Sequence, residues 1–145
     1  MSEIITEEMK RFNYLTTEID ATYHEVALKL GLSDSAMLIL YTICNNGESC
    51  MLNDICKLSG TSKQTINSSL RKLESEGIVY LERANGRRKK VCLTDKGKDL
   101  TNNTVVRLIK IENEIFGLWT KTERETYIQL TQKYLTTFKE KIKEL

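Results

Sequence analysis

The most informative part of the chain is Leu52–Leu93, whose sequence is LNDICKLSGTSKQTINSSLRKLESEGIVYLERANGRRKKVCL. It opens with a helical pattern over Leu52–Leu58, in which apolar residues recur every three positions. Ser59-Gly60 ends that pattern, because glycine accepts the backbone angles that a sharp turn demands. A second helix is expected to follow directly, with the Ser62 hydroxyl capping its first turn. The sequence therefore predicts two short helices joined by a turn.

The second helix has one apolar face and one polar face. Ile66, Leu70 and Leu73 fall at i, i+4 and i+7, so they form one buried stripe. The stretch 62–73 contains no acidic residue. Amide, hydroxyl and guanidinium groups hydrogen-bond to base edges and phosphates, whereas carboxylates repel the DNA backbone, so the polar face is predicted to bind DNA. The predicted contact residues are Ser62, Lys63, Gln64, Thr65, Asn67, Ser68 and Arg71.

A β-hairpin is predicted after this helix. Gly77 can end the helix in the left-handed conformation, and Ile78–Leu81 is β-branched and aromatic, which favours a strand. Asn85-Gly86 favours a two-residue type I′ turn, because both residues accept a positive φ. The pairs that such a loop predicts are Ile78 with Leu93, Tyr80 with Val91 and Glu82 with Lys89. In this register Cys92 would point away from Tyr80 and be partly exposed.

The tip and returning strand of the hairpin are strongly basic. Arg87, Arg88, Lys89 and Lys90 are consecutive, and four adjacent cations repel one another unless a polyanion neutralises them. Arg87, Arg88 and Lys89 are therefore predicted to contact DNA as well. Chance could explain why one short polar helix lacks acidic residues. It does not explain why a strongly basic hairpin follows that helix.

Four motifs follow one another at specific spacing: Thr61–Ile66 (TSKQTI), Leu70–Val79 (LRKLESEGIV), Arg87 and Leu93–Gly97 (LTDKG). In this order they resemble MarR-family transcriptional regulators over nearly the whole chain. The resemblance implies that the second helix lies in the major groove and that Arg87 enters the adjacent minor groove. Family wings commonly carry an aspartate two residues before this arginine, where this chain has Asn85.

The composition suits one mainly helical unit. A chain of 145 residues can bury one good core, and it has no proline and 29% charged residues. No apolar run approaches the length of a membrane span, and no signal peptide opens the chain, so we expect a cytoplasmic protein with no membrane partner. Residues 50–100 hold 11 basic and 6 acidic side chains, whereas residues 1–49 hold 3 and 8. Positive charge is thus concentrated on the segment predicted to bind DNA.

Helices are also predicted on both sides of this segment. An amphipathic pattern runs from about Glu7 to Leu30 and ends at Gly31, and a nearly continuous apolar helix runs from Ala36 to about Asn45 after the potential cap Ser33. The second of these is predicted to form the floor on which the two DNA-facing helices pack.

The carboxy-terminal part has two further helical patterns. One starts at Thr94 and carries a long apolar stripe to Leu118, and the next opens at Thr122–Glu125 with the spacing of a capping box. One small lobe cannot cover all these apolar faces, so a self-complementary dimer interface is expected. We predict one unit over residues 1–145, with a winged-helix lobe at 33–98 and a helical dimerisation region at 1–32 and 99–145.

Metal and thiol chemistry have weak signals. His24 is the only histidine; Asp20 lies one turn earlier, but a zinc site needs at least three protein ligands, so no metal site is predicted. The spacing of Cys44, Cys50 and Cys56 matches zinc motifs poorly. Together with Cys92 they are expected to be inert, because a reactive thiol needs an accessible, electropositive setting.

The sequence thus predicts a mainly α protein with a small β-hairpin wing, which binds a pseudo-palindromic operator as a homodimer, in the first place as a repressor. No catalytic residues and no cofactor are predicted, because no catalytic pair or phosphate-binding loop stands out. The resemblance also implies a small aromatic or lipophilic effector, for which Tyr23, Tyr41 and Trp119 are the predicted binding residues. Two alternatives stay open: a winged-helix module that binds protein, and a redox or metal sensor that uses Cys44, Cys50 or Cys56.

Overall fold

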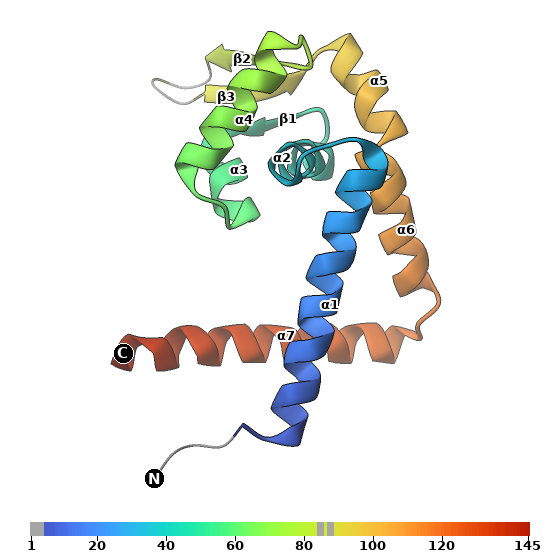
Figure 1. Cartoon of the computed structure of the whole chain (residues 1–145), viewed down its shortest axis with the longest axis vertical. Coiled ribbons are helices and arrows are strands. Elements are labelled where there is room, and N and C mark those ends of the chain that lie inside the picture. The colour runs from blue at the N-terminus through green and yellow to red at the C-terminus, as the bar shows by residue number, and fades with distance from the viewer. Residues whose placement is uncertain (1–4, 84–85, 87–88) are drawn as a thin grey trace. The chain divides into compact units, whose positions relative to one another are not determined.

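The structure is a computed structural model that describes residues 5–83, 86 and 89–145. Its contacts divide the chain into two compact units, residues 1–108 and 109–145. The elements in chain order are α1 (Glu7–Leu30), α2 (Asp34–Asn45), β1 (Ser49–Met51), α3 (Leu52–Ser59), α4 (Lys63–Ser75), β2 (Val79–Arg83), β3 (Lys89–Leu93), α5 (Asp95–Asn103), α6 (Val105–Gly117), α7 (Lys121–Lys141) and the 3-10 helix η1 (Ile142–Glu144) (Figure 1). The predicted fold class, mainly α with a small β wing, is confirmed.

The first helix has the predicted bounds. The Thr6 hydroxyl accepts a hydrogen bond from the backbone N–H of Met9 at 3.0 Å and so caps the first turn of α1. Gly31 ends the helix at φ +71°, in the left-handed conformation that a residue without Cβ adopts at little cost.

The core of the first unit is built on α2. Met37, Ile39, Leu40 and Ile43 of this helix are all buried, and α2 packs against α3, α4, α5 and the sheet. The Ser33 hydroxyl accepts from the backbone N–H of Ala36 at 3.1 Å and caps the helix. The prediction that this helix is the floor of the lobe is confirmed.

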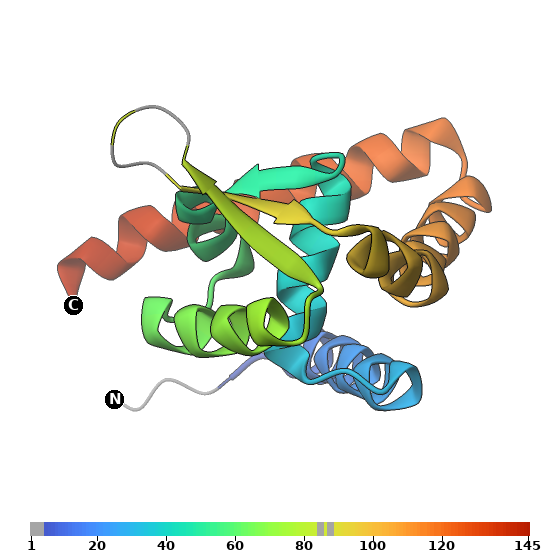
Figure 2. The ribbon, with the colours of Figure 1, turned by 90° about the horizontal axis from the view of Figure 1, so that it is seen from above.

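A three-stranded antiparallel sheet of order β1-β3-β2 lies beside these helices (Figure 2). The first strand, β1, is only three residues long, too short to produce an alternating pattern, and the sequence reasoning missed it. Val79 of β2 and Val91 of β3 are buried in the core, so the sheet closes one side of the lobe.

The strand register differs from the prediction by one residue. Tyr80 lies opposite Cys92, Leu81 opposite Val91 and Glu82 opposite Lys90. The predicted pairs, which rested on a turn at Asn85-Gly86, are therefore wrong. The core explains the difference, because the observed register turns Leu81 and Val91 toward the core and leaves Tyr80 on the outer face. Asn85, Arg87 and Arg88 lie outside the described residues.

A single long helix after Thr94 was also expected, but the chain forms α5 and α6 with a break at Thr104. Thr104 has φ −128° and ψ −94°, which are not helical angles. The segment before the break is Thr101-Asn102-Asn103-Thr104, and such side chains compete for backbone hydrogen bonds. Three of them do so here: the Thr101 hydroxyl donates to the Lys98 carbonyl at 3.0 Å, the Asn103 amide to the Asp99 carbonyl at 2.9 Å and the Thr104 hydroxyl to the Leu100 carbonyl at 2.7 Å.

The second unit contains α6 from Ile109 onwards and all of α7. Its capping box is formed by Thr120 and Glu123, not by Thr122 and Glu125 as predicted. The Thr120 N–H donates to Glu123 Oε1 at 2.9 Å, and the Glu123 N–H donates to the Thr120 hydroxyl at 3.1 Å. Both pairs have the right spacing, and the helix begins at the earlier one. These hydrogen bonds lower the pKa of Glu123.

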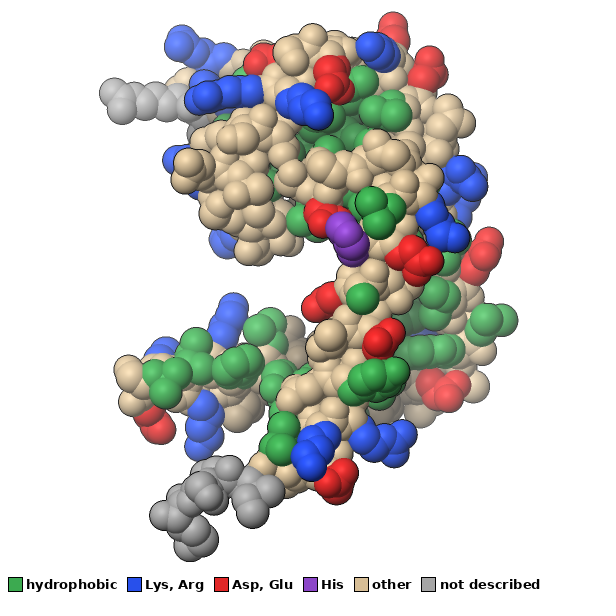
Figure 3. All heavy atoms as spheres, in the orientation of Figure 1, with side chains coloured by type: hydrophobic (Ala, Val, Ile, Leu, Met, Phe, Trp, Pro, Cys, Tyr) green, Lys and Arg blue, Asp and Glu red, His purple; other side chains and the backbone are tan. Residues whose placement is uncertain are grey.

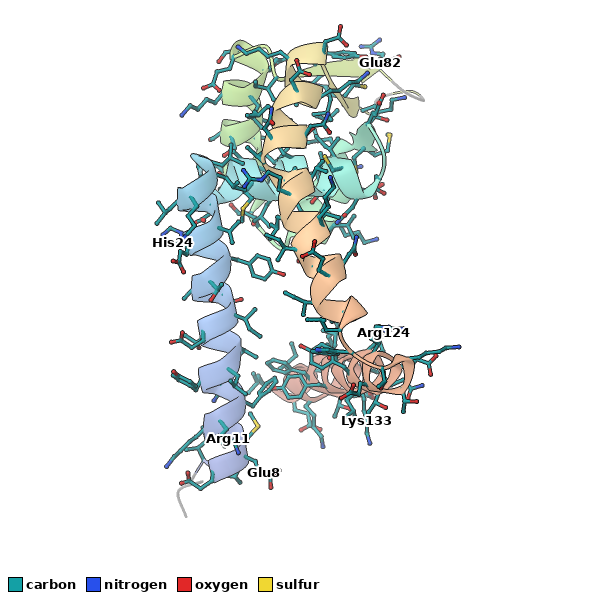
Figure 4. The ribbon with its side chains drawn as sticks, turned by 90° about the vertical axis from the view of Figure 1, so that its right-hand side faces the viewer. Glu8, Arg11, His24, Glu82, Arg124 and Lys133 are labelled. Carbon is teal, nitrogen blue, oxygen red and sulfur yellow. The ribbon has the colours of Figure 1, made fainter. Side chains whose placement is uncertain are left out.

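An aromatic corner joins α6 to α7. The ring centroids of Phe116 and Trp119 are 5.0 Å apart, and Trp119 meets Tyr127 edge to face at 5.3 Å. The Arg124 guanidinium, labelled in Figure 4, donates to the Phe116 carbonyl at 3.2 Å and to the Trp119 carbonyl at 2.6 Å. Phe116 lies in the last turn of α6 and Trp119 just after it, where a cation is stabilising.

Among the described residues, no single helix is long and apolar enough to cross a membrane. Only α1 and α2 taken together reach the required length and hydropathy, and they are bent by 91° at the break between them.

Candidate nucleic-acid interface

The interface is built around α4, whose start is held by two hydroxyls. The chain turns at Gly60, φ +67°, and enters α4 at Ser62. The Ser62 hydroxyl accepts from the Thr65 N–H at 3.2 Å and donates to the Thr65 hydroxyl at 2.9 Å. Because Ser62 uses its only hydroxyl proton inside the helix, it can offer DNA only an acceptor in this conformation. Its first role is therefore that of a helix cap.

The outward face of α4 forms a shallow hollow without acidic side chains. Ile66, Leu70 and Leu73 are buried on the opposite face, as predicted, and they fix the rotation of the helix about its axis. The hollow is lined by Lys63, Gln64, Asn67, Ser68 and Arg71. Five of the seven residues predicted on this helix are thus brought together at one surface, where two cations flank amide and hydroxyl groups.

Polar contacts tie α4 to α2 and α2 to α1. The hydroxyls of Ser35 and Ser69 are hydrogen-bonded between the start of α2 and the middle of α4. His24 Nδ1 lies 2.8 Å from the Asp34 carboxylate at the start of α2, and Figure 3 shows the single histidine against an acidic side chain. The neighbour that sequence reasoning considered, Asp20, is not this partner. The correct one, ten residues away, needs the turn at Gly31.

The described part of the wing adds a second set of cations. Lys89 of β3 lies opposite Arg83 of β2, and both border a hollow that also includes Leu81 and Glu82. The structure brings Lys89 to this surface, while the predicted contacts Arg87 and Arg88 are outside the described residues. Sequence reasoning missed Arg83, because only the correct register pairs it with Lys89.

The outer face of the sheet holds a small polar cluster behind these cations. Cys92 Sγ donates to the Glu82 carboxylate, labelled in Figure 4, at 3.5 Å. Cys92 is only 5% exposed, so it is buried and not partly exposed as predicted. Burial raises the pKa of the Cys92 thiol, and the hydrogen bond to Glu82 raises it further. Where the Cys92 thiol ionises, its negative charge in turn raises the pKa of Tyr80.

A salt bridge borders the same face. Lys98 Nζ of α5 lies 3.2 Å from the Glu48 carboxylate, which precedes β1. The hydrogen bond and the charge of Glu48 raise the pKa of Lys98. This cation therefore already has a carboxylate partner.

The predicted effector residues fall in both units. Tyr23 of α1 and Tyr41 of α2 belong to the first unit, and Tyr41 packs against its core. Trp119 belongs to the second unit, where it is packed in the aromatic corner with Phe116 and Tyr127. The residues that the structure describes include no group of three or more metal-ligating side chains, and all four cysteines are free.

Comparison with known proteins agrees with this geometry. Residues 30–90 match a sequence profile described as the MarR family. The chain resembles NMB1585, a MarR family regulator from Neisseria meningitidis, with a TM-score of 0.84 at 15% identity over 96% of this chain and 99% of that one. It resembles MepR of S. aureus, solved as a DNA complex, with a TM-score of 0.67 at 19% identity over 93% and 99% of the two chains.

A third similar structure is BpsR of Bordetella bronchiseptica, whose DNA binding is regulated by 6-hydroxynicotinic acid. Its TM-score is 0.62 at 19% identity, over 85% of this chain and 97% of that one. No curated protein sequence matches the chain. The structural likenesses show the fold, and the profile covers the α2–α4 helices and most of the wing. Taken together, these findings show a winged helix-turn-helix fold like that of the MarR family, and residues 30–90 match the sequence profile of that family.

Proposed function

We propose that this protein is a ligand-responsive repressor that binds a pseudo-palindromic operator as a homodimer. The observation that carries the proposal is the acid-free hollow on α4, lined by Lys63, Gln64, Asn67, Ser68 and Arg71. These side chains supply the donors and acceptors that read base edges in a major groove, and the two cations suit phosphates. Lys89 and Arg83 extend the positive surface to the wing, where charge dominates binding.

Homodimer formation is supported by the exposed apolar side chains of α7. Within this helix, all of which the structure describes, no side chain is buried. Figure 3 shows the hydrophobic side chains along it at the surface. Those at least 45% exposed include Tyr127, Ile128, Leu130, Leu135 and Phe138. An apolar surface of this kind is expected to be covered by a partner, and a second copy of the chain offers a self-complementary one.

Effector control is supported by the regulation of the similar protein BpsR by 6-hydroxynicotinic acid. Tyr23 and Tyr41 provide aromatic surface on α1 and α2 for a ligand of this class. Titration of the dimer with 6-hydroxynicotinic acid, followed by DNA release and by tyrosine fluorescence, tests this part. A Tyr23→Ala variant that keeps DNA binding and loses the response would support it; release of DNA in both proteins to the same extent would exclude Tyr23.

DNA recognition is tested by selection from a random pool, followed by affinity measurements on the selected and a scrambled duplex across a salt series. Gln64→Ala and Asn67→Ala are expected to cost about 1–3 kcal/mol on the selected duplex for each lost bidentate base contact, and little on the scrambled one. Arg88→Ala and Lys89→Ala are expected to weaken both and to lower the salt slope by about one per lost phosphate contact. We expect Arg87→Ala to lie between the two groups, with its largest effect where the minor groove is narrow.

The two groups of variants serve as controls for each other. Loss of specific and non-specific binding in the same ratio in all of them would contradict the assigned roles. A wild-type protein that selects no DNA would favour the winged-helix module that binds protein instead.

A further inference from the structure

The carboxy-terminal end of α4 is closed by a Schellman motif. Gly77, at φ +74°, donates its N–H to the Glu74 carbonyl at 3.0 Å, and Ile78 donates to the Leu73 carbonyl at 2.9 Å. This motif uses two of the carbonyls that the last turn exposes. The carbonyls of Glu76 and Gly77, the two residues after α4, receive no hydrogen bond from the helix itself.

Side chains at the start of α5 bind these two carbonyls. Lys96 Nζ donates to the Glu76 carbonyl at 2.8 Å, and the Thr94 hydroxyl donates to the Gly77 carbonyl at 2.5 Å. The same Thr94 hydroxyl accepts from the Gly97 N–H at 3.0 Å and so caps α5. One short segment therefore holds the end of α4 and the beginning of α5 together (Figure 1).

Gly97 allows the start of α5 to pack closely against the residue before β2. A Cβ at this position would lie 2.0 Å from the backbone carbonyl oxygen of Ile78, so only glycine lets α5 approach the start of β2 this closely. The Thr94 N–H donates to the same carbonyl at 3.1 Å. Within the LTDKG segment, Thr94, Lys96 and Gly97 thus hold the junction between α4, α5 and β2 together. None of these three roles is contact with DNA.

We propose that Lys96 is a positioning residue for recognition: its ammonium caps α4 and, with Thr94, fixes the helix against α5 so that the α4 hollow meets the bases in register. The proposal rests on the proposed DNA-binding function. By charge alone Lys96 would be counted with the phosphate-binding cations, but its ammonium is bound to the helix end. A cation at this end also favours the helix dipole.

The capping role is tested first without DNA, by amide hydrogen exchange on the full chain. Lys96→Met should speed exchange of the backbone amides of residues 76–78 several-fold, and Lys96→Arg should restore the wild-type rate. Lys98→Met is the matched control, since it removes the same charge from the same helix but breaks the bridge to Glu48. Unchanged exchange in Lys96→Met would overturn the proposal, whether or not the protein binds DNA.

The positioning role is tested on the selected and scrambled duplexes. Lys96→Met should weaken binding to the selected duplex about two- to fivefold, which is the stabilisation of about 0.3–1 kcal/mol by a cation at a helix end if all of it is transmitted to recognition. Binding to the scrambled duplex and the salt slope should stay as in wild type, and Lys96→Arg should restore the preference. A salt slope lower by about one would identify a phosphate contact and overturn the proposal, as would an unchanged preference. A wild-type protein without any preference would refute the proposed function and leave the exchange result to decide the cap.

Discussion

Tyr80 and Cys92 lie directly opposite each other on β2 and β3, on the face of the sheet turned away from the core. The tyrosine ring and the Glu82 carboxylate leave the Cys92 side chain almost without solvent contact. A predicted register one residue away would have exposed this thiol. The strand pairing therefore decides whether this thiol is accessible to solvent.

We expect Cys92 to be unreactive at neutral pH. Burial raises the pKa of its thiol, so the thiolate that attacks peroxides and alkylating agents is scarce. Burial also raises the pKa values of Cys44 and Cys50. Replacing Cys44, Cys50 and Cys92 singly by serine should leave the DNA affinity under mild peroxide the same as in wild type. Iodoacetamide labelling of the native protein, read by mass spectrometry, should be slower than labelling in denaturant.

The opposite result has a clear signature. If wild type loses DNA on mild oxidation while one serine variant does not, the protein is a thiol sensor. Zinc retained in native mass spectrometry would likewise favour the metal-sensor alternative over plain ligand control.

A second prediction concerns the coupling of folding and association. Removal of residues 134–145 takes away the apolar residues Leu135, Phe138 and Ile142, each at least 45% exposed in the single chain. If a second copy covers them, the truncated protein should aggregate or unfold, because folding and assembly are then linked. Sedimentation and circular dichroism measure this. A well-folded monomer at the same concentration would contradict the dimer proposal.

The sequence predicts local structure in this chain better than it predicts long-range pairing. Glycines with positive φ, such as Gly31 and Gly77, end helices where they were expected, because their signal is contained in a few neighbouring residues. The strand register was wrong because the loop motif Asn85-Gly86 competes with burial of Leu81 and Val91, and burial is a property of the whole core. The partner of His24 was missed for the same reason: Asp34 becomes a neighbour only once α1 and α2 have packed.

The candidate site likewise contains residues that local sequence predicts and residues that only tertiary packing reveals. The polar face of α4 follows from helical periodicity alone, so Gln64, Asn67 and Arg71 could be found from the sequence. Arg83 could not, since its place beside Lys89 depends on the register. The hydrogen bond from Lys96 to the Glu76 carbonyl depends on the packing of α5 against the end of α4. No pattern in the sequence distinguishes this lysine from its neighbours.

The capping box of α7 predicts a pH dependence. Hydrogen bonds from Thr120 lower the pKa of Glu123 below its ordinary value of 4.5, so the folded state favours the ionised carboxylate. This contribution is present above pH 4.5 and is lost as the pH falls through the lowered pKa. Wild type should therefore melt above Glu123→Gln at pH 6, and the difference should shrink towards zero in strong acid. Equal melting temperatures at pH 6 would show that the charge of Glu123 contributes nothing.

The last prediction compares two helical glycines whose surroundings differ. Alanine has a better helix propensity than glycine by about 1 kcal/mol, so both Gly97→Ala in α5 and Gly117→Ala in α6 would stabilise an isolated helix. A Cβ at Gly117 meets nothing within 4 Å, and we expect this variant to be neutral or stabilised by up to about 1 kcal/mol.

A Cβ at Gly97 would instead lie 2.0 Å from the Ile78 carbonyl oxygen, which belongs to the backbone and cannot rotate aside. The start of α5 must then move away from β2, which breaks the Thr94 contacts to the end of α4. We expect Gly97→Ala to lower the free energy of unfolding by roughly 1–3 kcal/mol, the usual cost of overpacking, against its helix propensity. Urea denaturation of wild type and both variants measures the change in the free energy of unfolding, which we expect to have opposite signs in the two variants. Equal effects would mean that α5 approaches β2 less closely than the structure shows, and the junction would then have no special need for glycine.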